Sequence, residues 1–213
     1  MALTVLGIST SPRQRGNSDL LLRQVLAGAE SAGASTEYLS LQGLRIAPCQ
    51  ACNACFKTGV CRVADDFPAV FDKLLAVDRL VLASPVHFMA VSAQAKLLID
   101  RCQCLWARKY ILHQPMFPEG ARDRRAMLIA VAGSRSTNMF RCLSLTMQSW
   151  LDAAAFDYAL NLFVNQVDER GAVMQHRAAL DEALRLGAEL VSGDKPGSEP
   201  RTVECFDGGK GSS

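Results

Sequence analysis

The sequence lacks an excess of charge of either sign, and it lacks any long apolar run. Among its 213 residues, 23 Lys and Arg stand against 21 Asp and Glu, for a formal net charge of +2. Basic residues spread along the chain leave no footprint for a polyanion, so neither nucleic acid nor a membrane surface is an expected partner. No apolar run approaches the ~18 residues needed to cross a bilayer, and the N-terminus does not resemble a cleavable signal. We expect a cytoplasmic protein.

Two nucleotide-binding signatures are also missing. Neither G-x-x-x-x-G-K-[ST] nor G-x-G-x-x-G occurs, which removes the main support for a nucleoside triphosphate site or for a dinucleotide fold built from two halves. The length suits one α/β domain with a sizeable core and is short for two. We predict one domain over residues 1–192. A mobile tail is expected over residues 193–213, where Gly, Ser, Pro and charged residues replace apolar periodicity.

Cysteine, by contrast, is concentrated in one stretch. Four of the eight cysteines follow the spacing C-x2-C-x2-C-x5-C, namely Cys49, Cys52, Cys55 and Cys61. Two residues between thiols let neighbouring sulfurs turn toward one centre, whereas disulfides usually join segments that are distant in sequence. Three thiolates on one tight loop can hold three corners of a cubane cluster, as in the bacterial ferredoxin run, and Cys61 can supply the fourth. The spacing therefore favours a [4Fe-4S] cluster.

Other uses of the cysteine stretch remain open. Zinc sites with four cysteines usually consist of two C-x2-C pairs with a long spacer, and here the third thiol follows the second by three residues. The ferredoxin run closes with Cys-Pro after three residues, whereas this one closes with Cys61-Arg62 after five. Zinc and a thiol loop without metal are the alternatives. Buried or incidental thiols are expected at the other four cysteines, Cys102, Cys104, Cys142 and Cys205.

Apolar runs and helical patterns alternate along the chain. Continuous apolar and β-branched runs indicate strands, and apolar residues that recur every three or four positions indicate helices. The expected strands are 3–8, 36–41, 79–84, 126–131 and 158–164. Each is followed by a helical pattern, the second of which is capped by Asp65 and Asp66. This order predicts an α/β protein with a doubly wound, five-stranded parallel sheet and helices on both faces.

Polar loops follow the expected strands at their carboxyl ends. The loop from Ser9 to Ser18 leads into a helix N-terminus, where backbone N–H groups and the helix dipole favour a phosphate, although an ordinary polar turn is the alternative. After residue 84, a Ser-Pro bend exposes backbone groups that can bond the edge of a flat heteroaromatic ring, while Phe88 can cover its face. For His87 we favour a structural role over a catalytic one. The cysteine stretch leaves the second strand and is expected on the same rim of the sheet.

The chain resembles the NADPH-dependent FMN reductase branch of the flavodoxin-like superfamily over about residues 1–190. With the cysteine stretch, it is most similar to the iron-sulfur flavoproteins of that branch. The resemblance rests on three stretches: Gly7-x-Ser9-x-Ser11-Pro12-Arg13-x-x-Gly16-Asn17-Ser18, Ser84-Pro85-Val86-x-Phe88 continued to Lys96, and Asp100-Arg101.

The resemblance implies an FMN site and assigns residues to it. The implied phosphate ligands are Ser9, Ser11, Arg13, Asn17 and Ser18. The implied ring contacts are Pro85, Val86, His87 and Phe88, with Gly133 and Ser134 opposite them. Many relatives have Tyr at the position of His87, a difference that bears on ring stacking but leaves backbone contacts open. The resemblance also implies a [4Fe-4S] cluster held by Cys49, Cys52, Cys55 and Cys61.

These cofactors imply an FMN-dependent oxidoreductase. A flavin accepts a hydride or single electrons and a cubane passes one electron at a time, so the pair would link two-electron donors to one-electron carriers. The expected donor is reduced ferredoxin or NAD(P)H, and the expected acceptor is a ferredoxin-like carrier or a small molecule. No catalytic acid or base is nominated. One alternative is a clusterless NAD(P)H-dependent FMN or quinone reductase with a structural cysteine loop, zinc included. The other is a non-enzymatic regulator that binds flavin or metal.

A homo-oligomer, either a dimer or a tetramer, is also expected. Phe56 and Val60 in the cysteine stretch, and Trp106 and Tyr110 beyond the core stripe of the third helix, would leave apolar surface exposed in a monomer. The resemblance points the same way, because relatives pair their flavin sites across subunits.

Overall fold

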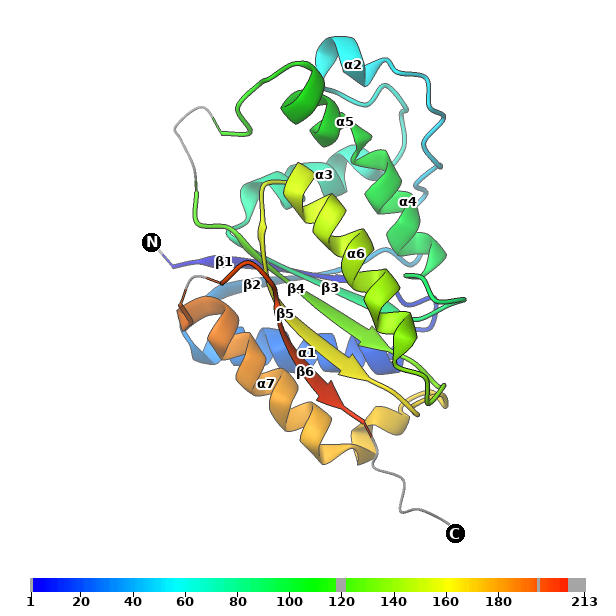
Figure 1. The fold of residues 1–213 in the computed structure, drawn as a ribbon, viewed down its shortest axis with the longest axis vertical. Coiled ribbons are helices and arrows are strands. Elements are labelled where there is room, and N and C mark those ends of the chain that lie inside the picture. Colours follow the sequence, from blue (N-terminus) through cyan, green and yellow to red (C-terminus); the bar gives the residue numbers. More distant parts are fainter. Residues whose placement is uncertain (1, 118–121, 195, 207–213) are drawn as a thin grey trace.

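A computed structural model describes residues 2–117, 122–194 and 196–206 of the chain. Its centre is a parallel sheet with the strand order β2-β1-β3-β4-β5-β6 (Figure 1). Continuous apolar runs make β1, β3, β4 and β5 buried strands, as expected for a sheet that is covered on both faces. The strand bounds are β1 (Thr4–Ser9), β2 (Ser35–Ser40), β3 (Arg79–Pro85), β4 (Arg125–Val131), β5 (Asp157–Val164) and β6 (Arg201–Cys205).

Helices cover both faces of the sheet, which confirms the predicted doubly wound arrangement. On one face lie α1 (Asn17–Ser31) and α7 (Arg177–Ser192). On the other face lie α3 (Phe67–Ala76), α4 (Ala93–Arg101), α5 (Gln103–Trp106) and α6 (Asn138–Ala153) (Figure 1). Short turns complete the fold: α2 (Cys55–Thr58), the π-helical η1 (Ala107–Ile111) and the 3-10 helix η2 (Ala172–Gln175). In the described residues, no helix is both long and apolar enough to span a bilayer.

The predicted number of strands is wrong, because the sheet has six strands and not five. The additional strand, β6, pairs in parallel with β5 from Leu160 opposite Arg201 to Val164 opposite Cys205. It lies within the segment 193–213, where no strand was expected. This edge strand is short and mostly exposed, and only Val203 and Cys205 turn toward the core, so it carries too few apolar residues to produce a periodic signal.

Polar groups at the amino end of the strands are satisfied within the fold. Buried Arg124 donates to the carbonyl oxygens of Val77 (2.9 Å) and Ala154 (2.8 Å), and its guanidinium lies 3.6 Å from the ring centre of Phe156. Buried Arg79 donates to the carbonyl oxygen of Leu190 at 2.8 Å. These arginines close the carboxyl ends of α3, α6 and α7, where the helix dipole favours a positive charge. The loops that carry most of the expected site residues lie at the opposite end of the sheet.

Candidate functional site

Loops after β1, β3, β4 and β5 surround a hollow of about 540 Å³, counting its space open to solvent. We call it the strand-end hollow. It brings together eight of the eleven residues that the resemblance assigns to FMN: Ser11, Arg13, Asn17, Ser18, Pro85, Val86, His87 and Gly133. Ser9, Phe88 and Ser134 do not line it. Because the carboxyl ends of parallel strands meet at one edge, loops that are distant in sequence become the walls of a single site.

The first wall is the loop between β1 and α1, and it ends in a helix N-terminus without a side-chain cap. Gly16 is the N-cap residue, and within the described residues no side-chain cap hydrogen bond is made to this helix start. A Cβ at Gly16 would lie 2.6 Å from Ser11 Oγ, so the loop can fold this closely only around glycine. Ser11 Oγ donates to Arg13 O (2.9 Å) and accepts from Arg13 N (3.1 Å). The uncapped amides and the helix dipole therefore offer a site for an anion.

Two of the implied phosphate ligands, Asn17 and Ser9, make other contacts in the structure. The Asn17 side chain donates to the carbonyl oxygens of Val167 (3.3 Å) and Glu169 (2.8 Å) and accepts from Val173 N (3.3 Å). It therefore joins the start of α1 to the loop after β5. Ser9 is buried and faces a neighbouring hollow beside Tyr38. The anion site is thus formed mainly by backbone amides, together with Ser11, Arg13 and Ser18.

The second wall is the bend after β3. Val86 N donates to Val131 O at 2.8 Å, and His87 and Ala90 exchange two backbone hydrogen bonds of 3.0 Å. At the tip of this bend, Phe88 and Met89 both have positive φ, 49° and 60°. The Phe88 side chain is fully exposed and points away from the hollow, contrary to its expected position over a ring. The tight turn that aims the backbone at the hollow also turns this side chain outward.

The third wall contains residues that the sequence analysis missed. Val131 ends β4, and the loop after β5 adds Val167, Asp168 and Arg170. A Cβ at Gly133 would lie 2.8 Å from the Asp168 side chain, so the two loops touch at this glycine. Ser134 instead accepts from Ser136 N at 3.1 Å. The loop after β5 carries no recognisable motif, and the only signal was its position at the carboxyl end of a strand.

A second hollow, of about 390 Å³ with its open space, is lined by Cys49, Cys52, Cys55 and Cys61. We call it the cysteine hollow. All four cysteines are free thiols, the first two exposed and the others half-buried. Arg101 and Cys104 also line it, and neither was expected there. Burial raises the pKa of Cys104 to about 11, so this fifth sulfur stays a thiol at neutral pH.

Left-handed backbone bends the cysteine stretch around its hollow. Ala51 lies between the first two cysteines with φ 49°, and Asn53 lies between the next two with φ 55°. This region costs a residue such as Ala51 about 1–2 kcal/mol, whereas Asn tolerates it better. Six of the eight described non-glycine residues with positive φ belong to loops at the two hollows: Arg15, Ala51, Asn53, Phe88, Met89 and Gln166. Strain gathered in this way is typical of functional loops.

The four clustered thiols influence each other electrostatically. Burial raises the pKa of Cys55, and the charges of the other three cysteines raise it further. A cation among them would remove this repulsion, and thiolates are suitable ligands for iron or zinc. In the part of the chain that the structure describes, no three His, Cys, Asp or Glu side chains are already close enough to hold one ion. The donor set fits a metal centre, and binding would require the thiols to move closer together.

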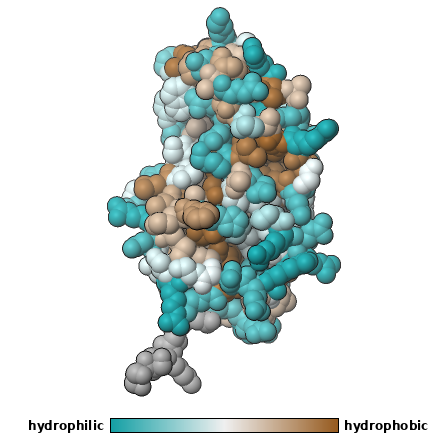
Figure 2. Space-filling view, turned by 90° about the vertical axis from the view of Figure 1, so that its right-hand side faces the viewer, coloured by the Kyte–Doolittle hydropathy of each residue, from teal (hydrophilic) through white to brown (hydrophobic). Residues whose placement is uncertain are grey.

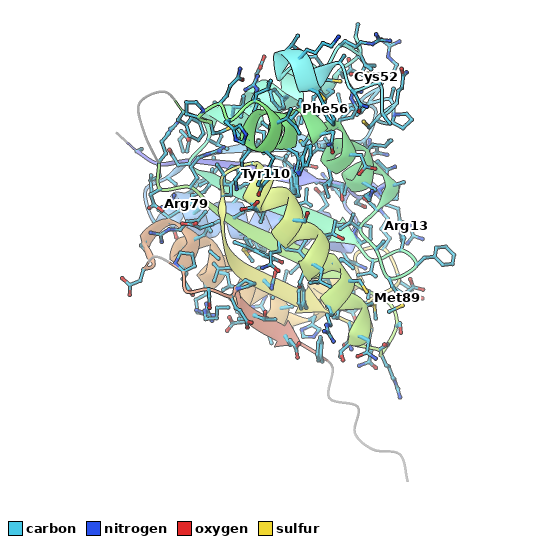
Figure 3. All side chains as sticks on the ribbon, turned by 45° about the horizontal axis from the view of Figure 1, so that its top comes forward. Arg13, Cys52, Phe56, Arg79, Met89 and Tyr110 are labelled. Carbon is cyan, nitrogen blue, oxygen red and sulfur yellow. The ribbon has the colours of Figure 1, made fainter. Side chains whose placement is uncertain are left out.

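The two hollows lie at opposite ends of α4. This helix starts behind the bend that lines the strand-end hollow and ends at Arg101 in the cysteine hollow. Its nine residues span about 14 Å. Figure 3 accordingly shows Cys52 and Phe56 at one end of the molecule, well apart from Arg13 and Met89. The expectation that the cysteine stretch lies on the same rim of the sheet is wrong. The chain leaves β2 at this rim, but an irregular segment before Cys49 carries it away along α4 and α5.

Comparison with known proteins gives a family and a fold. Residues 3–155 match the profile of the NADPH-dependent FMN reductases. An iron-sulfur flavoprotein of Methanocaldococcus jannaschii is 42% identical over 103 residues, which are 48% of this chain and 53% of that protein. One from Archaeoglobus fulgidus is 35% identical over 131 residues, 62% of this chain and 63% of that protein. The matches thus span between half and two thirds of these relatives.

Solved structures share the fold at low sequence identity. The NAD(P)H:quinone oxidoreductase from Methanothermobacter marburgensis superimposes with a TM-score of 0.71 at 16% identity, over 92% of this chain and all of that one. A flavone reductase gives a TM-score of 0.68 at 17% identity, over 93% of this chain and 66% of that one. The flavodoxin-like architecture expected from the sequence is therefore confirmed.

Proposed function

Because the chain belongs to the NADPH-dependent FMN reductase family, we propose that it binds FMN in the strand-end hollow and a [4Fe-4S] cluster in the cysteine hollow. The family membership makes the protein an oxidoreductase, as expected, and leaves the non-enzymatic regulator without support. When bound, the flavin would supply two-electron chemistry and the cluster one-electron chemistry. Electrons would pass between NAD(P)H or reduced ferredoxin and a ferredoxin-like carrier or small acceptor.

The observation that carries FMN binding is the uncapped N-terminus of α1 at the edge of the strand-end hollow. Its first amides, with Ser11, Ser18 and the guanidinium of Arg13, would bind the phosphate. Backbone groups at Pro85 to His87 and at Gly133 would bond the edge of the ring system. Arg170 adds a second guanidinium to the same hollow. No side chain there is needed as an acid or base.

The cluster proposal is supported by four free thiols around one hollow and by the names of the relatives in Methanocaldococcus and Archaeoglobus. Anaerobic purification followed by analysis of iron, acid-labile sulfide and FMN would test it. We expect four irons and four sulfides per chain, as a cubane requires, together with bound flavin. Stoichiometric zinc, or the absence of metal and sulfide after reconstitution, would contradict the cluster.

A clusterless FMN or quinone reductase is the second candidate, with the cysteine stretch structural or holding zinc. It is favoured by the open arrangement of the thiols in the described structure. Absorption spectra separate the two candidates, because a cluster adds broad visible absorption beneath the flavin bands and makes the protein brown. Yellow protein with full activity and no iron would establish the clusterless reductase.

A homo-oligomer is proposed on the basis of exposed apolar surface. Phe56, Trp106 and Tyr110 form an aromatic row with centroid separations of 5.9 and 5.7 Å, and Val60 and Ile111 are exposed as well. Figure 2, which views the side on which the strands end, shows further hydrophobic surface at mid-height among polar residues. Such surface is usually covered by another subunit. Light scattering that gave the single-chain mass of 23.1 kDa would contradict this proposal.

A further inference from the structure

Arg101 is a fully buried arginine at the carboxyl end of α4, where it lines the cysteine hollow. Only 1% of its surface is exposed, and a buried charge is unfavourable unless it is paired and hydrogen-bonded. Its carboxylate partner is Asp65, whose Oδ2 lies 2.5 Å from Nη1 and whose Oδ1 lies 3.2 Å from Nη2. Asp65 Oδ1 also accepts from Phe67 N, the first amide of α3, at 3.0 Å, whereas Asp66 at the N-cap accepts from Arg45 N instead. The pair is therefore anchored to the body of the fold.

This ion pair connects the two ends of the cysteine stretch. Arg101 donates to Ala47 O at 3.0 Å and to Val63 O at 3.3 Å. Asp65 Oδ2 accepts from Ala47 N at 2.9 Å. Ala47 lies two residues before Cys49, and Val63 lies two residues after Cys61. The charged pair thus fixes both ends of the segment that carries all four clustered thiols.

One donor of Arg101 is left over. In the described residues, its Nε is buried and has no hydrogen-bond partner, whereas the other two nitrogens are fully used. Arg101 and Cys61 line the same cysteine hollow, so the guanidinium and this thiol face one shared space. A buried donor normally has a hydrogen-bond partner. The Arg101 Nε–H group would gain one if a cysteine sulfur accepted from it once a metal centre is bound in the cysteine hollow.

We propose that Arg101 is the positioning residue of the cysteine hollow. With Asp65 it holds the ends of the stretch in place, and it brings an N–H group and a positive charge to the cysteine hollow. This role rests on the proposed cluster. Hydrogen bonds to ligand sulfurs and nearby positive charge stabilise the reduced form of an iron-sulfur centre, so Arg101 would raise its reduction potential.

Three variants separate positioning from mere structural support. Arg101→Gln removes the charge and the guanidinium fork, Arg101→Lys keeps the charge but loses the fork, and Asp65→Asn leaves Arg101 without its carboxylate partner. Arg108→Lys is the matched control, since Arg108 also donates to the cysteine stretch, at Gly59 O (2.8 Å), but does not line the hollow. The full chain is reconstituted anaerobically with iron and sulfide, and the cluster potential is measured by titration followed by electron paramagnetic resonance.

We expect Arg101→Gln to lower the equilibrium constant for cluster reduction at least tenfold, which is about 59 mV for one electron. Arg101→Lys should give a smaller shift, and Asp65→Asn should speed the loss of iron to a chelator without lowering the potential. Arg108→Lys should leave the potential unchanged, and FMN content should be constant throughout. If Arg101→Gln fails to fold or to hold iron, Arg101→Lys still tests the effect on the reduction potential. Asp65→Asn still tests the effect on iron retention.

Different results would contradict the cluster proposal and the proposed role of Arg101. Wild-type protein without sulfide would overturn the cluster and this role with it. A wild-type cluster whose potential is the same in the Arg101 variants, or shifts equally in Arg108→Lys, would leave the cluster standing and overturn the role of Arg101.

Discussion

The two hollows of this molecule are built in opposite ways. Four of the five thiols of the cysteine hollow belong to one continuous stretch whose ends are fixed by a single ion pair, and their side chains remain available. The strand-end hollow is assembled from four loops that are distant in sequence, and several of its polar side chains are already used to shape those loops. One site therefore depends on side-chain identity, and the other depends mainly on where the backbone lies.

This difference predicts how each site responds to substitution. Removing one of the four clustered cysteines removes a proposed ligand, since nothing else in the stretch has the same chemistry. Removing a side chain from the strand-end hollow leaves most of the backbone amides in place.

The largest effect is expected from alanine at a clustered cysteine. Cys52→Ala or Cys55→Ala should lose most of the iron, because a cubane needs all four thiolates, while FMN content stays near that of the wild type. Iron, sulfide and flavin analysis of anaerobic protein measures both sites at once. Cys142→Ala is the control, since Cys142 is an exposed thiol on α6. Equal iron in Cys52→Ala and wild type would show that these thiols are not the ligands.

The next effect concerns the anion site at the start of α1. The double variant Ser11→Ala with Arg13→Ala should weaken FMN binding by about 1.5–3 kcal/mol, the contribution of a charge-assisted hydrogen bond. Iron content should not change. Fluorescence titration of the apoprotein with FMN gives the affinity. Arg15→Asn is the control, because Arg15 lies in the same loop but outside the strand-end hollow, and Asn tolerates its positive φ of 53°. Unchanged FMN affinity in the double variant would contradict the phosphate position.

A purely steric change should have a comparable or smaller effect on the same site. In Gly16→Ala, the added Cβ would meet Ser11 Oγ at 2.6 Å and Arg13 O at 3.2 Å, so the loop must open. Overpacking of this kind costs about 1–3 kcal/mol, and we expect the cost to weaken FMN binding by up to that amount. Gly197→Ala is the control, since its Cβ would meet nothing within 4 Å. If Gly16→Ala bound FMN as tightly as wild type, the backbone would not be the main binding element.

The same contrast explains what the sequence could predict. Spacing alone identified the four clustered cysteines, because all four lie within one short segment of the sequence. Alternating strands and helices indicated the doubly wound sheet, the loop after the first strand indicated Ser11 and Arg13, and the resemblance added Gly133. Arg101 was seen only as part of a family motif, and its link to Ala47 and Val63 appears only once α4 packs beside the cysteine stretch.

Other features depended on tertiary structure that no local pattern records. Asp168 and Arg170 reach the strand-end hollow because β5 lies beside β4, and nothing in their own loop marks them. The strand β6 exists because β5 offers it an edge to pair with. Asn17 was assigned to phosphate by resemblance, yet its bonds to the loop after β5 show a side chain that holds two loops together.

The smallest effect is expected at Phe88, and it tests the comparison most directly. The sequence predicts that Phe88 covers the face of a bound ring, whereas the structure leaves it fully exposed at the tip of a turn with positive φ. Phe88→Ala should therefore change FMN affinity by less than about 0.5 kcal/mol, as is usual for an exposed side chain. The same FMN titration measures it, with exposed Leu145→Ala as the control. A loss as large as that of the Ser11 and Arg13 double variant would mean that Phe88 folds over bound flavin in its own chain or in a neighbouring subunit. The strand-end hollow would then depend on a side chain after all.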